Sequence, residues 1–115
     1  IVRGNTQRAL VKMLREAGAA EVHVRISSPP VEWPCFYGID FATRAELIAP
    51  GMTVDEICRS IGADSLAYIS LDGLIASTGL AKQRLCRACF DGVYPVEIPE
   101  RVAGRMHLTM EAHSE

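Results

Sequence analysis

The cysteines are the residues of this sequence best suited to chemistry. Cys86 and Cys89 form a CxxC pair, a spacing that brings two sulfurs close enough to share one metal centre. Redox dithiols use the same spacing, but they usually stand at the start of a helix that follows a buried strand. Here Leu85 is the only apolar neighbour ahead of the pair, and residues 79–84 form a polar connector. The pattern therefore favours metal binding over redox exchange.

The other cysteines could complete such a centre, and their surroundings differ. Cys35 follows Pro34 and precedes aromatic residues, a rigid and shielded position that suits a metal-bound thiolate. Cys58 lies on the apolar face of an expected helix, where a free cysteine packs as a small hydrophobic residue. If all four cysteines converged, they would form a closed structural zinc site instead. The residues alone leave zinc and iron–sulfur both open.

A second pattern stands at the start of the chain, ahead of an expected helix. A glycine lets the backbone approach a ligand closely, and the first N–H groups of a helix point at the same spot. Together with the helix dipole, they make a site for an anion such as phosphate. Any capped helix after a glycine would look the same, so this signal alone is weak. The residues that would form the site are Val2, Arg3, Gly4, Asn5 and Thr6.

Helical and strand patterns alternate in the first part of the chain. A helix that Asn5 or Thr6 caps is expected to end at Gly18. Residues 21–27 alternate apolar and polar positions, which predicts a strand. A helix followed directly by such a strand is half of a βαβ unit, whose first strand would precede Ile1. The apolar face of the helix comprises Ala9, Leu10, Met13, Leu14 and Ala17.

Further elements follow a proline-interrupted loop that carries Cys35. A short helix is expected over residues 43–49, and a clearer one over residues 53–61, where Thr53 and Glu56 form a capping box. A strand over residues 66–71 and a helix over residues 72–78 complete the pattern. The sequence therefore predicts an α/β fold, and we expect one incomplete domain followed by a tail.

Composition narrows the classes of function. The 115 residues carry a net charge of −2 with lysine and arginine scattered along the chain, which argues against nucleic acid as a partner. No apolar run approaches the ~20 residues that a membrane span requires, and no signal peptide opens the chain. The cysteines then suit a reducing compartment, so we expect a cytoplasmic protein. Because the chain starts without methionine, we expect a fragment or a processed product.

Other polar and aromatic residues have plainer explanations. His23 falls between the apolar positions of its strand, so we expect a solvated side chain rather than a ligand. Trp33 beside Pro34 is expected to fill a packing gap. Asp40 is expected to cap the following helix.

The opening residues, Ile1-Val2-Arg3-Gly4-Asn5-Thr6, resemble the second half of the phosphoribosylpyrophosphate motif of the amidophosphoribosyltransferases. That family has a type I phosphoribosyltransferase-like fold with a Rossmann-like parallel sheet. The resemblance implies that the backbone from Val2 to Thr6 wraps the 5-phosphate of the substrate. Asn5 departs from the family pattern, in which threonine is commoner at this position. The acidic pair that binds the ribose hydroxyls in the family would precede Ile1.

The cysteines match the same family. Its iron–sulfur members hold a [4Fe–4S] cluster, and Cys35, Cys86 and Cys89 match cluster ligands that follow the phosphate motif. A further ligand would lie upstream. The resemblance runs from Ile1 to about Pro99 and implies a C-terminal part of a phosphoribosyltransferase domain (1–99), whereas residues 100–115 are expected to be a tail. Other stretches that look like the family are Tyr37-Gly38-Ile39-Asp40, Ala45-Glu46-Leu47-Ile48-Ala49, Ile61-Gly62-Ala63-Asp64-Ser65-Leu66 and Tyr94-Pro95.

The resemblance also implies the reaction of a parent enzyme. Ammonia from glutamine would displace pyrophosphate, held with Mg²⁺, from phosphoribosylpyrophosphate to give 5-phosphoribosylamine, the first step of de novo purine synthesis. Purine nucleotides would inhibit it, and a nucleotide bound at the active site is the alternative contact for Asp40. The remaining N-terminal part and further copies of the enzyme would be its partners. This chain would contain no catalytic residue and would be inactive alone. The alternatives are a structural zinc module or another type I phosphoribosyltransferase.

Overall fold

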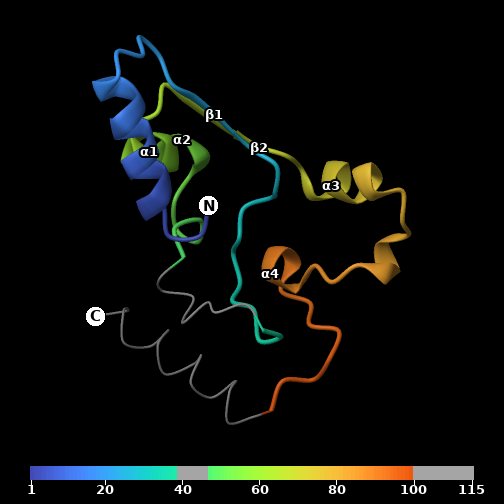
Figure 1. Ribbon diagram of the computed structural model, residues 1–115. Coiled ribbons are helices and arrows are strands. Elements are labelled where there is room, and N and C mark those ends of the chain that lie inside the picture. Colours follow the sequence, from blue (N-terminus) through green and yellow to red (C-terminus); the bar gives the residue numbers. More distant parts are fainter. Residues whose placement is uncertain (39–46, 100–115) are drawn as a thin grey trace.

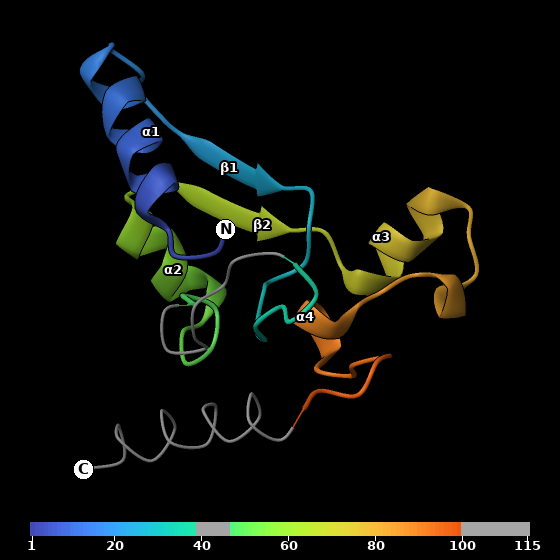
Figure 2. The same cartoon turned by 60° about the horizontal axis from the view of Figure 1, so that its bottom comes forward.

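Two parallel strands organise the chain, whose computed structural model describes residues 1–38 and 47–99. Strand β1 (His23–Ile26) pairs with β2 (Ser65–Tyr68), so that His23 lies beside Ser65 and Ile26 beside Tyr68. Helices α1 (Asn5–Glu16) and α2 (Val54–Ile61) lie side by side on one flank of this sheet, as the views in Figure 1 and Figure 2 agree. The predicted α/β class is confirmed.

The remaining elements lie beyond the carboxyl ends of the strands. Helix α3 (Leu71–Thr78) follows β2 directly, and a 3₁₀ turn η2 (Lys82–Arg84) leads to the short helix α4 (Ala88–Asp91). The segment after β1 runs away from the sheet and meets α4, a course visible in Figures 1 and 2. Within the described residues, no helix is long and apolar enough to cross a membrane.

The start of α1 differs from the expected one. Neither Asn5 nor Thr6 caps this helix, because its N-cap is Gly4, in a left-handed conformation with φ 84°, and no side chain bonds the first turn. Asn5 is already helical, and its side-chain oxygen accepts from Arg8 instead. The expected C-terminus is confirmed, since Ala17 caps the helix and Gly18 follows with φ 102°.

The apolar face expected for α1 is not a core face among the described residues. Leu10, Met13 and Leu14 remain 42%, 56% and 46% exposed, whereas Val11 is buried. Val11 lies on the side of α1 that faces the end of α2. Its γ-methyl is 3.8 Å from the position that a methyl group at Gly62 would occupy. Contact with α2 therefore decides which side of α1 is buried.

Helix α2 follows its sequence signals closely. The Thr53 hydroxyl oxygen accepts from the N–H of Glu56 at 3.2 Å, and Gly62 ends the helix with φ 79°. Ile57 and Ile61 enter a core with Ile48 and Ala49, against which Val24 and Leu66 of the strands pack. Burial of these apolar side chains is what fixes the helices on the sheet.

Both strands are shorter than expected, and the described part of the helix predicted over residues 43–49 is not helical. β2 ends at Tyr68 because the Ser70 hydroxyl already accepts from the N–H of Gly73 and starts α3, so Leu71 is helical. Of the helix expected over residues 43–49, residues 43–46 lie outside the described residues. Residues 47–49 are buried but not helical.

Candidate functional site

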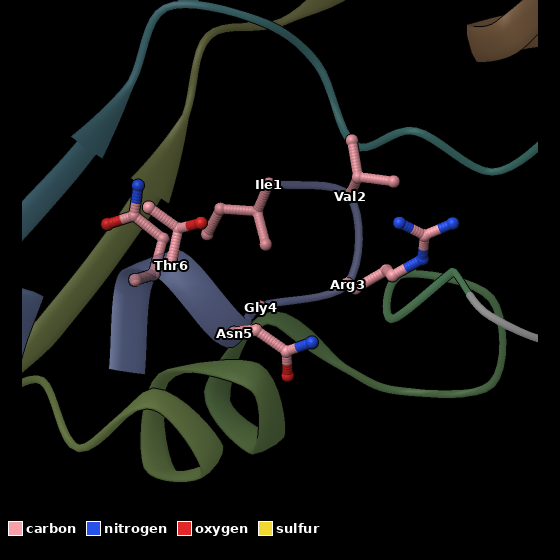
Figure 3. Close-up of a pocket in the computed structure, with 7 residues that line it drawn as sticks. Ile1, Val2, Arg3, Gly4, Asn5 and Thr6 are labelled. Atoms are coloured by element: carbon pink, nitrogen blue, oxygen red, sulfur yellow. The ribbon is translucent and has the colours of Figure 1, made fainter. Parts of the chain in front are cut away.

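A pocket open to solvent on one side lies where the loop that precedes α1 meets the first turn of this helix. Residues 1–7 line a space of about 220 Å³, and every residue predicted to hold phosphate is among them. Figure 3 shows the backbone curling round from Ile1 to Gly4, so that Ile1 and Thr6 face each other while Arg3 and Asn5 point outward. The fold therefore brings Val2, Arg3, Gly4, Asn5 and Thr6 together round one hollow.

Glycine is required at the turn of this loop. At φ 84° Gly4 is in the left-handed region, and a methyl group there would lie 3.0 Å from Cδ1 of Ile48. The loop is tied to the same segment, since the Ile48 N–H donates to the Val2 carbonyl at 2.9 Å. The tight turn is thus packed against the core rather than hanging free.

The pocket suits an anion. It opens at the N-terminus of α1, whose first N–H groups have no intrahelical partner and carry the positive end of the helix dipole. No acidic residue lies in the first turn of the helix, so no carboxylate competes for that end. Backbone N–H groups and the Thr6 hydroxyl can donate to phosphate oxygens at such a site.

A second candidate site lies where the segment after β1 meets α4. The carbonyl of Cys89 accepts from the N–H groups of both Glu32 and Trp33, at 3.0 and 3.1 Å. The Tyr94 hydroxyl donates to the carbonyl of Pro34 at 2.7 Å. These bonds join residues 32–34 to residues 89–94, and so carry Cys35 to the neighbourhood of the CxxC pair.

The thiols of this second site act on one another. Burial raises the pKa of the Cys89 thiol, and the nearby Cys35, Cys86 and Asp91 raise it further. Cys35 is half-buried, Cys86 is exposed, and the Tyr37 N–H donates to the Cys35 sulfur at 3.4 Å. Across the residues that the structure describes, no group of three or more His, Cys, Asp or Glu side chains is already arranged to hold a metal ion. The thiols are neighbours without forming a closed cage.

The remaining candidates behave as packing or surface residues where they are described. The Cys58 thiol is buried on α2 and donates to the Ala63 carbonyl at 3.3 Å, as expected of a core cysteine. His23 is exposed and bonded to Glu21 and Ser65. Trp33 packs on Gly92, which confirms its packing role. Asp40, His107 and His113 lie outside the described residues.

Sequence reasoning did not identify Arg8 as part of the first site. Its guanidinium lies beside Gly4, because a methyl group on Gly4 would come within 3.5 Å of both Cζ and Nη1. It also bonds Asn5 and Ser60. A basic residue on the first turn of a helix is an ordinary surface pattern, so only the approach of α2 reveals its position.

Fold and site together define an α/β unit with a glycine-turn pocket at a helix N-terminus, and with backbone bonds that join the segment before Cys35 to the segment of the CxxC pair. No family model matches the chain. Known proteins do match: the amidophosphoribosyltransferase of Mycobacterium tuberculosis is 60% identical over 108 residues, which are 90% of this chain and 20% of that protein. The Bacillus subtilis enzyme of the same name is 55% identical over 102 residues, 85% of this chain and 21% of its own.

Solved structures agree with these relatives. Glutamine phosphoribosylpyrophosphate amidotransferase from B. subtilis, complexed with ADP and GMP, superposes with a TM-score of 0.78 at 54% identity. That match covers 87% of this chain and 23% of the solved one. A structure described as the allosteric regulatory enzyme of purine biosynthesis gives 0.79 at 55% identity, over 87% of this chain and 22% of its own. The chain thus corresponds in sequence and fold to a segment of the amidophosphoribosyltransferases, and it spans about a fifth of their length.

Proposed function

We propose that this chain is the part of an amidophosphoribosyltransferase that supplies the loop for the 5-phosphate of phosphoribosylpyrophosphate. The whole protein would make 5-phosphoribosylamine from that substrate and glutamine, the first step of de novo purine synthesis. The observation that carries the proposal is the pocket formed by residues 1–7. It lies in a chain that is 60% identical to such an enzyme over 90% of the chain's own length.

The role assigned to the loop is to position the substrate. Amide groups from Val2 to Thr6 hold the phosphate, and this fixes the ribose so that ammonia can displace pyrophosphate from its C1 atom. Transfer of this kind depends on geometry and on fixed charges around the reacting carbon rather than on a protein nucleophile. Mg²⁺ is assigned to the pyrophosphate of the substrate. No residue of this chain is assigned to the glutaminase reaction or to catalysis, and we expect the chain alone to be inactive.

We assign Cys35, Cys86 and Cys89 to a [4Fe–4S] cluster whose remaining ligand lies in the rest of the protein. Thiolates are the ligands that such clusters use, and the bonds from the Glu32 and Trp33 N–H groups to the Cys89 carbonyl, which bring the segment before Cys35 to the CxxC pair, support the assignment. The cluster would supply a structural link and no electron transfer in the reaction. It would clip the segment after β1 to α4, where backbone bonds to the Cys89 carbonyl already join them.

Ligands and partners of the whole protein belong to the same proposal. The B. subtilis relative was solved with ADP and GMP, which supports purine nucleotides as regulators here. The other partners would be the N-terminal part of the enzyme, which provides glutaminase activity, and further copies in a homo-oligomer. Free cysteines suit a reducing compartment, so the cytoplasm is the proposed location.

A hybrid enzyme tests the phosphate loop. Residues 1–115 replace the matching segment of the M. tuberculosis relative, and phosphoribosylamine formation is measured. Activity is expected, and Gly4→Ala should raise the KM for phosphoribosylpyrophosphate at least about tenfold, because the added methyl group crowds Ile48 and displaces the loop.

Gly51→Ala is the matched control for this hybrid. Gly51 has the same φ of 84°, but a methyl group there meets nothing within 4 Å. It should therefore carry the backbone strain without the effect on KM. A folded hybrid that forms no phosphoribosylamine would overturn the proposed function, and equal KM values for the two variants would overturn the role of the loop.

Metal analysis tests the cluster and separates it from a zinc module. Iron and sulfide should load together under anaerobic conditions and give an absorbance band near about 400 nm. Cys35→Ser, Cys86→Ser and Cys89→Ser should each lower iron retention severalfold, whereas Cys58→Ala should not, since that thiol is occupied in the core. Stoichiometric zinc without sulfide, lost in all four variants, would support the zinc alternative instead.

A further inference from the structure

Arg8 links the phosphate loop to the far end of helix α2. Its Nε donates to the Ser60 carbonyl at 3.1 Å, and its Nη2 donates to the Ser60 hydroxyl at 2.7 Å. Its Nη1 donates to the side-chain oxygen of Asn5 at 3.2 Å. The guanidinium is thereby held at both edges, by residues that are far apart in the sequence.

The bonds to Ser60 use a favourable position. Ser60 lies in the last turn of α2 (Val54–Ile61), where carbonyls lack intrahelical partners and carry the negative end of the helix dipole. A guanidinium at this end is stabilised by its charge as well as by its hydrogen bonds. Nε and Nη2 of Arg8 are therefore anchored on α2, and this anchoring presents Nη1 to the loop in a fixed orientation.

This anchoring fixes the orientation of Asn5. Arginine has donors only, so the carboxamide of Asn5 must turn its oxygen towards Arg8. Its NH₂ group then faces the other way. The Asn5 side chain points outward from the loop (Figure 3), so the bond from Arg8 fixes the start of α1, where the Asn5 backbone lines the pocket of residues 1–7.

We infer that Arg8 is a positioning residue for the phosphate loop: bound to Ser60, it holds Gly4 and Asn5 in the arrangement that receives the 5-phosphate. The inference rests on the proposed function for the identity of the ligand. Arg8 acts through Asn5 and need not touch the phosphate.

Arg15 provides a matched control on the same helix. Its Nη2 donates to the Gly62 carbonyl at 2.7 Å and to Asp64 at 2.9 Å, so it also ties α1 to the end of α2. Unlike Arg8, it is bonded to nothing in residues 1–7 through the contacts described for it. Loss of either arginine loosens the helix pair, whereas loss of Arg8 alone should disturb the loop.

The test compares Arg8→Met and Arg15→Met in the 115-residue chain. Backbone and Asn5 side-chain order are measured by ¹⁵N relaxation, and affinity is measured by titration with ribose 5-phosphate. In Arg8→Met, order at residues 4–6 should fall, and affinity should drop about tenfold, as expected for the loss of an oriented backbone hydrogen-bond donor. Thermal stability should fall by similar amounts in the two variants. In Arg15→Met, however, loop order should be unchanged and affinity should stay within about twofold of the unaltered chain.

Two further variants separate geometry from charge. Arg8→Lys keeps the charge but lacks the fork that reaches Ser60 and Asn5 together, so it should not restore affinity. Asn5→Ala should weaken binding in the unaltered chain but cause no further loss beside Arg8→Met. Full rescue of affinity by lysine would overturn the inference, and so would equal effects of the two methionine variants on loop order and affinity. Loop disorder in Arg8→Met, in a chain that never binds ribose 5-phosphate, would uphold the positioning role and count against the proposed phosphate site.

Discussion

Trp33 and Gly92 make the tightest side-chain contact described for any glycine of the chain. A methyl group at Gly92 would lie 2.7 Å from Cε2 of the Trp33 ring, a distance at which something must move. Gly92 also has φ 74° and caps α4, so only glycine satisfies both the backbone and the space available. This contact keeps the end of α4 against the segment that carries Cys35.

Gly92→Ala is expected to destabilise the chain by about 2–5 kcal/mol, the sum of left-handed strain and overpacking. Gly79→Ala is the control, because Gly79 caps α3 at φ 68° and a methyl group there meets nothing within 4 Å. It should cost only about 1–2 kcal/mol, the strain term alone. Urea unfolding followed by tryptophan fluorescence measures both, and equal losses would show that the Trp33 contact is unimportant.

At the scale of elements, local signals decided some boundaries and distant contacts decided others. Helix α2 could be predicted because Thr53 and Gly62 specify its ends within a few residues of sequence. The start of α1 could not, because Asn5 bonds Arg8, whose position depends on Ser60, 52 residues further along. The spacing of the CxxC pair pointed to metal binding, but the grouping of Cys35 with that pair came from family resemblance, since hydrogen bonds between residues 32–34 and residues 89–94 have no local signature.

Removal of the α2 cap gives a prediction at this scale. Thr53→Ala should destabilise the chain by about 1 kcal/mol, because the N–H of Glu56 loses its acceptor. Thr53→Ser keeps a hydroxyl oxygen at the cap and should recover most of that loss. Thermal unfolding followed by circular dichroism measures the difference. Equal stabilities of the alanine and serine variants would rule out the hydroxyl as the stabilising group.

At the scale of the whole molecule, Asp64 connects three elements. Asp64 immediately precedes β2. Its carboxylate accepts from the Val22 N–H, just before β1, at 2.7 Å and from Arg15 of α1 at 2.9 Å. The bond from the Val22 N–H, followed by the bond and charge of Arg15, lowers the pKa of Asp64 below its ordinary value of 3.8. The carboxylate form is therefore favoured by folding.

The lowered pKa sets the direction of the pH dependence. Stability from Asp64 is fully present above the unfolded value of 3.8 and is lost as pH falls through the lower folded pKa. Asp64→Asn should be less stable than the unaltered chain at pH 7, and the gap should narrow below pH 3.8. Arg15→Met leaves the Val22 bond in place and should keep most of the dependence. Melting temperatures between pH 2 and 7 test this, and a gap that is constant with pH would contradict it.

The contacts that bring the cysteine segments together are themselves inert to oxidants. They use the Cys89 carbonyl, the Pro34 carbonyl and the Tyr94 hydroxyl, and no sulfur takes part in them. If the proposed cluster lost its iron to air, or a thiol were oxidised, these bonds would remain in place. The proposed cluster would then reassemble on the reduced sulfurs without the polypeptide having to refold round it.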